Sequence, residues 1–257
     1  MFEKSGLVRR SVWLAAFASV VVAPAARAQD AAGLPAAKEL IAKYEAAIGG
    51  DNWKKHKSAR MKATMEMAGN GMKGDMEVVQ IYPDHVSSKM TITGLGDMRT
   101  GYDGTTAWSI NPMTGPQVLA GPQADALKES ADPEKTQRND ANLTSAETIE
   151  KTNMNGEDCY KVKLTWKNGK TSTDCYSVSS GLLVATTEKT ATPMGEIEST
   201  TYQAAYKDFG GTKRATMITQ EAMGQRSTIT VTAWEWDNVD AKEIDLPAEI
   251  KALVKKP

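Results

Sequence analysis

The chain has 257 residues, and its 31 Lys and Arg are nearly balanced by 32 Asp and Glu. That balance gives no electrostatic footprint for nucleic acid or for an anionic membrane surface, so neither is an expected partner. The length is enough for one all-β domain, or two small ones, with a real core. Thirteen Met against three Phe is an unusual choice of apolar side chains.

The first 28 residues have the three parts of a secretory signal peptide. Lys4, Arg9 and Arg10 form a positive start, residues 11–24 are apolar but too short to span a bilayer, and residues 26–28 form a small-x-small cleavage site. We predict cleavage near Ala28 and a periplasmic mature protein. Ordinary secretion and twin-arginine export both remain open.

The mature chain, residues 29–257, is predicted to be a single domain with no lipid anchor. Residues 1–28 hold four basic residues and one acidic residue, so the mature chain keeps 27 basic and 31 acidic residues and a net charge of −4. No Cys follows the cleavage site, and no later apolar stretch is long enough to be an integral membrane segment.

Residues 35–48 predict an amphipathic helix, which begins at a proline and ends at Gly49-Gly50. From Ser58 the apolar residues alternate with polar ones, which is the pattern of a half-buried antiparallel strand. Similar strands are expected over 72–82, from Val86 to Ile92 and around Trp108. After a break over residues 111–146, strands are expected to resume at Thr148 and to continue to Asp237. A short helical or irregular tail follows them.

Residues 111–146 interrupt this rhythm with four prolines and many polar residues, so we expect a Pro-rich insertion or lid with one short helix over 123–130. No helix separates consecutive strands, which argues against a parallel sheet. The expected fold is therefore mainly β: a curved, incomplete antiparallel β-barrel, or half-barrel. Its open side is expected to be covered by the N-terminal helix and the helical insertion.

Nothing in the sequence indicates catalysis or a metal site. His56 and His85 are the only histidines, and neither lies in a metal-ligand spacing. The nucleophile elbow and the phosphate-binding and dinucleotide-binding glycine motifs are absent. We therefore expect no catalytic residues, no metal and no cofactor, and a hydrolase is the least supported class.

Cys159 and Cys175 are the only cysteines and flank an Asn168-Gly169 turn. In an oxidising compartment a disulfide between them is expected, with two buried thiols as the alternative. A two-residue Asn-Gly turn pairs Lys167 with Lys170, which puts the cysteines on opposite faces of the hairpin. A disulfide therefore requires a bulge or a longer loop.

The methionines gather on the apolar faces of the first three expected strands, among alanines and a glycine. A Met-filled core is one interpretation. The other is a ligand surface, because unbranched, polarisable Met adapts to variable apolar partners and few helices are available to cover the sheet. The predicted ligand-binding residues are Met61, Met65, Met76, Val78, Met90 and Ile92, with Trp108 at the wall or rim of the cavity.

Several short segments resemble one family. They are residues 47–50 (AIGG), 102–104 (YDG) before Trp108, 159–164 (CYKVKL), 180–183 (SGLL), 209–213 (FGGTK) and 246–247 (LP). Together they resemble exported proteins of the lipoprotein-carrier (outer-membrane lipoprotein-sorting) superfamily. The resemblance implies a curved half-barrel whose cavity holds acyl chains. An arginine on an early strand locks the lid in that family, and Arg60 and Arg99 are both candidates for its position.

Two functions remain in view. The first is a soluble periplasmic carrier or receptor that binds the acyl chains of a lipid or an acylated protein. The second is a cell-envelope interaction or sensor module that uses the same fold to bind a protein partner. Lipid in the cavity favours the first, whereas a packed interior and a stable protein complex favour the second.

Overall fold

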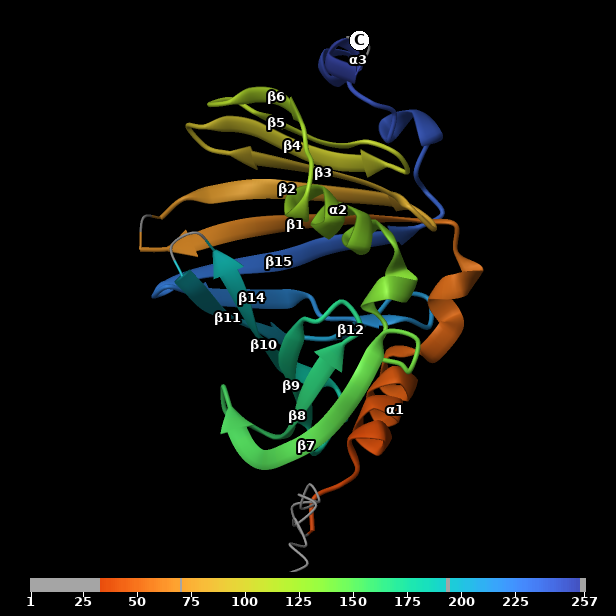
Figure 1. Cartoon of the computed structure of the whole chain (residues 1–257), viewed down its shortest axis with the longest axis vertical. Coiled ribbons are helices and arrows are strands. Elements are labelled where there is room, and N and C mark those ends of the chain that lie inside the picture. Colours follow the sequence, from red (N-terminus) through yellow and green to blue (C-terminus); the bar gives the residue numbers. More distant parts are fainter. Residues whose placement is uncertain (1–32, 70, 193–194, 255–257) are drawn as a thin grey trace, which may run out of the picture.

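A computed structural model describes residues 33–69, 71–192 and 195–254 (Figure 1). The predicted signal peptide and its cleavage site lie outside these residues. The fold is mainly β, as predicted: one open antiparallel sheet of 13 strands with a few helices. Strands that are consecutive in the chain pair as antiparallel neighbours, with two exceptions: a long connection joins the edge strands β6 and β7, and the β12–β13 hairpin lies between β11 and β14.

The sheet order is β6-β5-β4-β3-β2-β1-β15-β14-β11-β10-β9-β8-β7, so β6 and β7 are its two edges. The strands are β1 (Ser58–Ala68), β2 (Lys73–Ile81), β3 (His85–Ile92), β4 (Gly96–Asp103), β5 (Ala107–Asn111), β6 (Gly115–Val118), β7 (Leu143–Met154), β8 (Glu157–Trp166), β9 (Thr171–Ser177), β10 (Leu183–Thr192), β11 (Gly195–Ala204), β14 (Met217–Ala222) and β15 (Gln225–Trp236). A separate two-stranded hairpin contains β12 (Lys207–Asp208) and β13 (Lys213–Arg214). Figure 1 shows the sheet twisting along its length, so that β7 to β9 run at a steep angle to β1 to β6.

The helices are α1 (Ala37–Ile48), α2 (Pro122–Ala131) and α3 (Ala248–Val254), with short 3-10 helices η1 (Gly50–Lys55), η2 (Pro133–Thr136) and η3 (Ala241–Glu243). α1 ends where Gly49 adopts a left-handed φ of 100°. A Cβ at Gly49 would lie 2.1 Å from the carbonyl oxygen of Gly211, so the close approach of the β12–β13 hairpin also requires glycine there.

The insertion is more regular than the sequence predicted. α2 corresponds to the expected short helix, but residues 115–118 form β6 at the sheet edge, and β7 begins at Leu143 rather than at Thr148. The prediction missed β6 because this four-residue strand contains Pro116, which favours irregular structure. An edge strand tolerates a proline because one side of its backbone needs no sheet partner.

The two longer helices cover the same face of the sheet, which we call the inner face. Leu40 and Ile41 of α1 pack in a cluster with four almost fully buried residues of β8 to β10, namely Val162, Leu164, Tyr176 and Leu183. α2 packs against the other half of the sheet, where Ala131 is fully buried beside Val86 and Tyr102. The expected covering of the open side by these helices is therefore observed.

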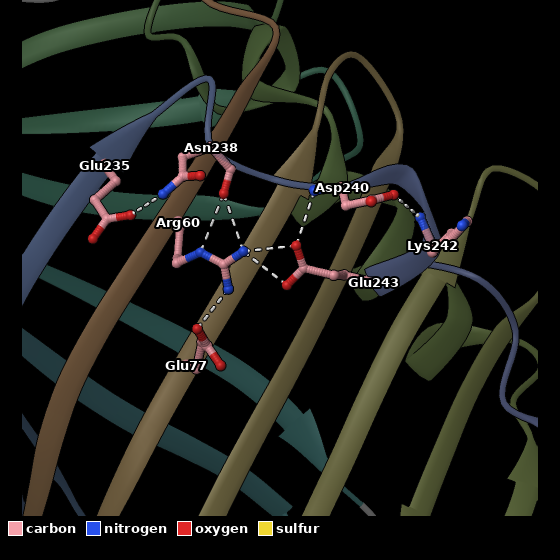
Figure 2. Close-up of polar contacts among 7 residues, drawn as sticks. All are labelled: Arg60, Glu77, Glu235, Asn238, Asp240, Lys242 and Glu243. Atoms are coloured by element: carbon pink, nitrogen blue, oxygen red, sulfur yellow. Dashed lines mark hydrogen bonds and ion pairs between the residues drawn. The ribbon is translucent and has the colours of Figure 1, made fainter.

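The C-terminal segment crosses the opposite, outer face and is held there by Arg60 (Figure 2). One terminal nitrogen of Arg60 donates to Glu77 at 2.6 Å, and the other donates to the Glu243 carboxylate at 2.7 Å and to the Asn238 carbonyl at 3.0 Å. The Glu243 carboxylate also accepts a hydrogen bond from the backbone N–H of Asp240. Three acceptor groups on one guanidinium thus tie β1, β2 and residues 238–243 together.

Cys159 and Cys175 form the predicted disulfide, with Cα atoms 5.5 Å apart. The hairpin loop is longer than a two-residue turn: Trp166, not Lys167, bonds to Lys170, and Gly169 has a φ of 84°. This shifts the register by one residue, so that Cys175 pairs with Lys161 and both cysteines lie on the outer face. The prediction that a disulfide here requires a bulge or a longer loop is therefore confirmed, because the loop is longer.

Candidate functional site

Six predicted residues lie together on the inner face of β1 to β3 and form what we call the methionine surface: Met61, Met65, Met76, Val78, Met90 and Ile92. The register explains the grouping, because Met61 pairs with Val78 and Met76 pairs with Met90. Directly paired residues point to the same side of a sheet. The register thus places the six residues on one face, as the period-2 pattern of the sequence predicted.

The methionine surface is only partly covered. Met65 and Ile92 are 9% and 5% exposed, whereas Met61, Met76 and Met90 are half-buried. Val78 packs at the edge of the α2 cluster. Small residues separate the methionines, since Ala63 lies opposite Met76 and Gly74 lies opposite Met65. The result is an uneven apolar surface with flexible side chains beside small ones.

Trp108 does not belong to this surface, although the sequence placed it at the wall or rim. It pairs with Gly101 of β4, whose neighbour Tyr102 points to the inner face, so Trp108 points to the outer face. The ring lies against Gly101, where a Cβ would come within 2.6 Å of it. Trp108 is 3% exposed and borders a recess of about 300 Å³ beneath Glu243 and Pro247.

A second recess of about 330 Å³ also opens on the outer face, between Lys62, Asp75, Lys89 and Thr91. The methionine surface is neither of these two recesses. It is a partly exposed surface between the areas covered by α1 and α2, and an enclosed Met-rich cavity remains a prediction. The recess beside Lys62 has charged walls. The outer face of β1 to β3 is therefore charged, whereas the inner face of the same strands is apolar.

The apolar area continues onto strands that the sequence did not assign to the site. Ile229 of β15 pairs with Met65, and Ile218 of β14 pairs with Ile229. Trp234 pairs with Met61 after a register shift in β1 between Lys62 and Ala63. The sequence could not show that β15 lies beside β1, since the two strands are far apart in the chain.

A buried ion pair lies on the inner face beneath α1. The Asp174 carboxylate has no exposed surface and accepts hydrogen bonds from Arg138, from the Tyr176 hydroxyl at 2.9 Å and from the Thr186 hydroxyl at 2.7 Å. Burial alone would lower the pKa of Arg138, but the neighbouring carboxylate of Asp174 raises that pKa overall. Burial raises the pKa of the Tyr44 hydroxyl. The Arg138 Cζ atom lies 5.7 Å from the centre of the Tyr44 ring. The three hydrogen bonds to the Asp174 carboxylate, one of them from a cation, explain why a charge is tolerated there.

A second guanidinium, that of Arg214, lies in an aromatic cluster at the end of β15. Its Cζ atom is 5.2 Å from the ring centre of Trp234 and 5.8 Å from that of Trp236. His56 stacks on Trp236 at 4.3 Å, and the Trp236 indole N–H donates to the Phe209 carbonyl at 2.7 Å. Burial lowers the pKa of Arg214. The sequence had no motif that singled out this arginine.

Each of the two histidines contacts one aspartate. His56 bonds to Asp237 at 2.8 Å and His85 bonds to Asp84 at 2.7 Å. Within residues 33–69, 71–192 and 195–254, no group of three His, Cys, Asp or Glu side chains is arranged to hold a metal ion. In the same residues, no helix is long and apolar enough to cross a membrane.

Neither candidate for a lid-locking arginine faces the methionine surface. Arg60 and Arg99 lie on the outer face, where Arg60 bonds to Glu243 and Arg99 bonds to Glu249 of α3 at 3.3 Å. Both arginines therefore hold the C-terminal segment. Among the residues that the structure describes, no arginine of β1 to β4 lies on the inner face.

The comparisons with known proteins support the same architecture. No protein-family model matches the sequence, and no curated protein matches it. Among solved structures, a LolA superfamily protein from Nitrosomonas europaea is 13% identical with a TM-score of 0.55, covering 83% of this chain and 99% of its own. The chain has the lipoprotein-carrier fold. The resemblance inferred from short sequence segments is thus confirmed at the level of fold.

Two further structures agree with this assignment. A DUF1329 family protein from Desulfovibrio piger is 12% identical with a TM-score of 0.56, covering 84% of this chain and 100% of its own. A domain named as an outer-membrane lipoprotein-sorting protein, from Vibrio parahaemolyticus, is 11% identical with a TM-score of 0.51, covering 85% of this chain and 97% of its own. At these identities the similarity concerns the fold alone.

Proposed function

We propose that this protein is an exported carrier or receptor that binds the acyl chain of a lipid or acylated protein on its methionine surface. The observation that carries the proposal is the partly exposed row of methionines between two helix-covered areas of one sheet face. A sheet face that is only core usually holds branched and aromatic side chains, which specify one packed arrangement. Methionine instead adapts to a flexible apolar partner.

The energy of such binding is sufficient without a polar anchor. Burial of about ten methylenes contributes roughly 8 kcal/mol, at about 0.8 kcal/mol for each, before the ordering costs of association. Half-buried methionines also favour ligand entry, because part of their surface is already open to solvent. α2 and the rest of the 111–146 insertion border this area and are proposed to act as its movable cover, together with α1.

A pair of substitutions on opposite faces tests the proposal. Met76→Asp places a carboxylate on the methionine surface and should abolish binding of a fluorescent fatty acid. Lys62→Asp introduces the same side chain at an exposed position of the outer face and should leave binding unchanged. Far-ultraviolet circular dichroism of both variants checks that they fold.

Two outcomes would support the alternative, a cell-envelope interaction or sensor module. One is equal loss of binding from both faces, and the other is absence of binding by the unaltered protein. In either case the inner face is better explained as a packing surface for a protein partner. Organic extraction of natively purified protein, followed by mass spectrometry, distinguishes the two functions independently.

The location proposed for this activity is the periplasm. Export through the signal peptide of residues 1–28 should yield a mature protein that begins at or next to Gln29. Intact-mass measurement of periplasmic material tests this, and a mass that retains residues 1–28 would contradict it. The proposed function uses no metal or cofactor and no catalytic group, so a chelator should leave the melting temperature unchanged.

A further inference from the structure

The two arginines that lie beside the inner face differ in their counter-ions. Arg138 is paired with the buried carboxylate of Asp174. Arg214 forms no ion pair with any carboxylate in the part of the chain that the structure describes, and the titratable groups around it are the uncharged phenols of Tyr82, Tyr44 and Tyr206. An arginine stays protonated in proteins, so the interior carries a positive charge that these residues do not balance.

Arg214 and its aromatic neighbour also present hydrogen-bond donors that have no acceptor. The Arg214 Nε and the Trp234 Nε1 are buried and make no hydrogen bond within residues 33–69, 71–192 and 195–254. Both atoms can only donate. Buried donors without partners are rare in folded proteins, and a pair of them beside an unbalanced charge fits an oxyanion.

The position of Arg214 connects it to the methionine surface. Its guanidinium stacks on Trp234, and Trp234 is the register partner of Met61. From Met61 the surface runs along β1 to Met65, a distance of about 13 Å for four residues of a strand. Arg214 therefore lies at one end of the apolar row, and its residue as a whole is partly exposed although its Nε is buried.

We propose that Arg214 binds the oxyanion headgroup of an amphiphile whose acyl chain lies along the methionine surface. The headgroup is a carboxylate or a phosphate, since both accept hydrogen bonds from a guanidinium in the same geometry. This inference rests on the proposed function and adds the class of ligand: anionic amphiphiles over neutral ones. Stacking on Trp234 and Trp236 orients the guanidinium but leaves its charge unbalanced.

The test compares ligands that differ only in the headgroup. Dodecanoate, lauroyl lysophosphatidic acid and the neutral monolauroylglycerol compete with a fluorescent fatty acid for the full-length mature protein. We expect one or both anionic ligands to bind about tenfold more tightly than the neutral one. The tighter of the two anions identifies a carboxylate or a phosphate headgroup.

The matched variants are Arg214→Gln and Arg226→Gln. Arg226 lies on β15 with a side chain that is 52% exposed, and it pairs with Glu221. Arg214→Gln should remove the tenfold preference while monolauroylglycerol binds as before, and Arg226→Gln should retain the preference. Arg214→Lys keeps the charge and should retain part of the preference.

A measurement on the unaltered protein avoids dependence on the folding of the variants. The Arg214 Nε–H signal in a nitrogen-15 NMR spectrum should move on titration with dodecanoate and stay in place with monolauroylglycerol. Equal affinity for anionic and neutral ligands, or an unmoved Arg214 signal, would overturn the headgroup inference and leave acyl-chain binding intact. Absence of binding by all three ligands would overturn the proposed function itself.

Discussion

The inner face of one sheet contains two regions that differ in side-chain type and in cover. Beneath α1, Val162, Leu164 and Tyr176 have no exposed surface. On β1 to β3, Met61 and Met76 lie on the same face of the same sheet and remain partly exposed. In the first region, the apolar side of α1 packs closely on the sheet. In the second region, α2 covers only one end of the methionine surface.

We infer from this difference that the two halves of the sheet are suited to different roles. Branched and aromatic residues under α1 have few rotamers and specify one packing, so this half is suited to stability. Methionines beside Ala63 and Gly74 specify no single packing, so this half is suited to variable contact. Three predictions test whether stability and binding are divided in this way, and the smallest expected effect concerns the outer face.

The largest expected effect is on the buried ion pair of the α1-covered half. Asp174→Ala leaves the charge of Arg138 without its partner and should lower the free energy of unfolding by about 3–5 kcal/mol, measured by urea denaturation. Asp158→Ala, at a carboxylate that is 60% exposed beside Lys151, is the control and should leave the midpoint nearly unchanged. Equal losses would show that burial of the pair is not what matters.

Truncation of one apolar side chain in each region sharpens the comparison. Leu164→Ala creates a cavity in the packed cluster and should cost about 2–5 kcal/mol of stability. Met76→Ala removes a half-buried, flexible side chain and should cost about 1 kcal/mol while weakening fatty-acid binding. Similar destabilisation by the two variants would mean that the methionines form an ordinary core.

The disulfide belongs to the stable half, on the outer face of β8 and β9. Replacing Cys159 and Cys175 together with Ala should lower the free energy of unfolding by about 3 kcal/mol, because the bond closes a loop of 16 residues in the unfolded chain. Fatty-acid affinity should stay the same, since neither cysteine faces the methionine surface. A loss of affinity in the folded variant would contradict the separation of the two halves.

The smallest effect concerns the C-terminal segment on the outer face. Hydrogen bonding by Arg60 lowers the pKa of Glu243, so the charged carboxylate stabilises the attached segment. This contribution is complete above the ordinary glutamate pKa of about 4.3 and is lost as the pH falls through the lowered value. The hydrogen-exchange protection of residues 238–245, measured relative to the intrinsic exchange rate at each pH, should fall on acidification across that range.

Glu243→Gln provides the matching experiment at neutral pH. Loss of the charged hydrogen bond costs about 1 kcal/mol, so tryptic cleavage after Lys242 should become about fivefold faster. Glu77→Gln removes the other carboxylate of Arg60 without touching the segment and should change cleavage less. Cleavage that is insensitive to both variants would show that Arg60 does not hold the segment.

Local patterns predicted much of the fold and part of the site. Alternation over 58–92 predicted three strands and placed six residues on one face, because period-2 patterning determines the face directly. The sequence placed Trp108 on the wrong face of the sheet. Its face follows from its pairing with Gly101 of β4, and the pattern of apolar residues does not specify that pairing. β6 was missed because its pairing with β5, rather than its own residues, makes it a strand.

Long-range contacts account for the rest. Arg138 and Asp174 are 36 residues apart in no motif, so only the folded sheet brings them together. The aromatic neighbours of Arg214 come from β15. In the sheet, β15 lies beside β1, although the two are the last and first strands in the chain. The disulfide was predicted from the compartment, while its register depended on a loop one residue longer than the Asn-Gly dipeptide suggests.

The central claim is that the methionine surface is where an acyl chain binds, and methyl NMR tests it most directly. With carbon-13 in the methionine methyl groups, titration with dodecanoate should move the signals of Met61, Met65, Met76 and Met90. The exposed methionines Met113, Met217 and Met223 are internal controls, and their signals should stay in place. Movement confined to these three controls, or no movement at all, would contradict the account.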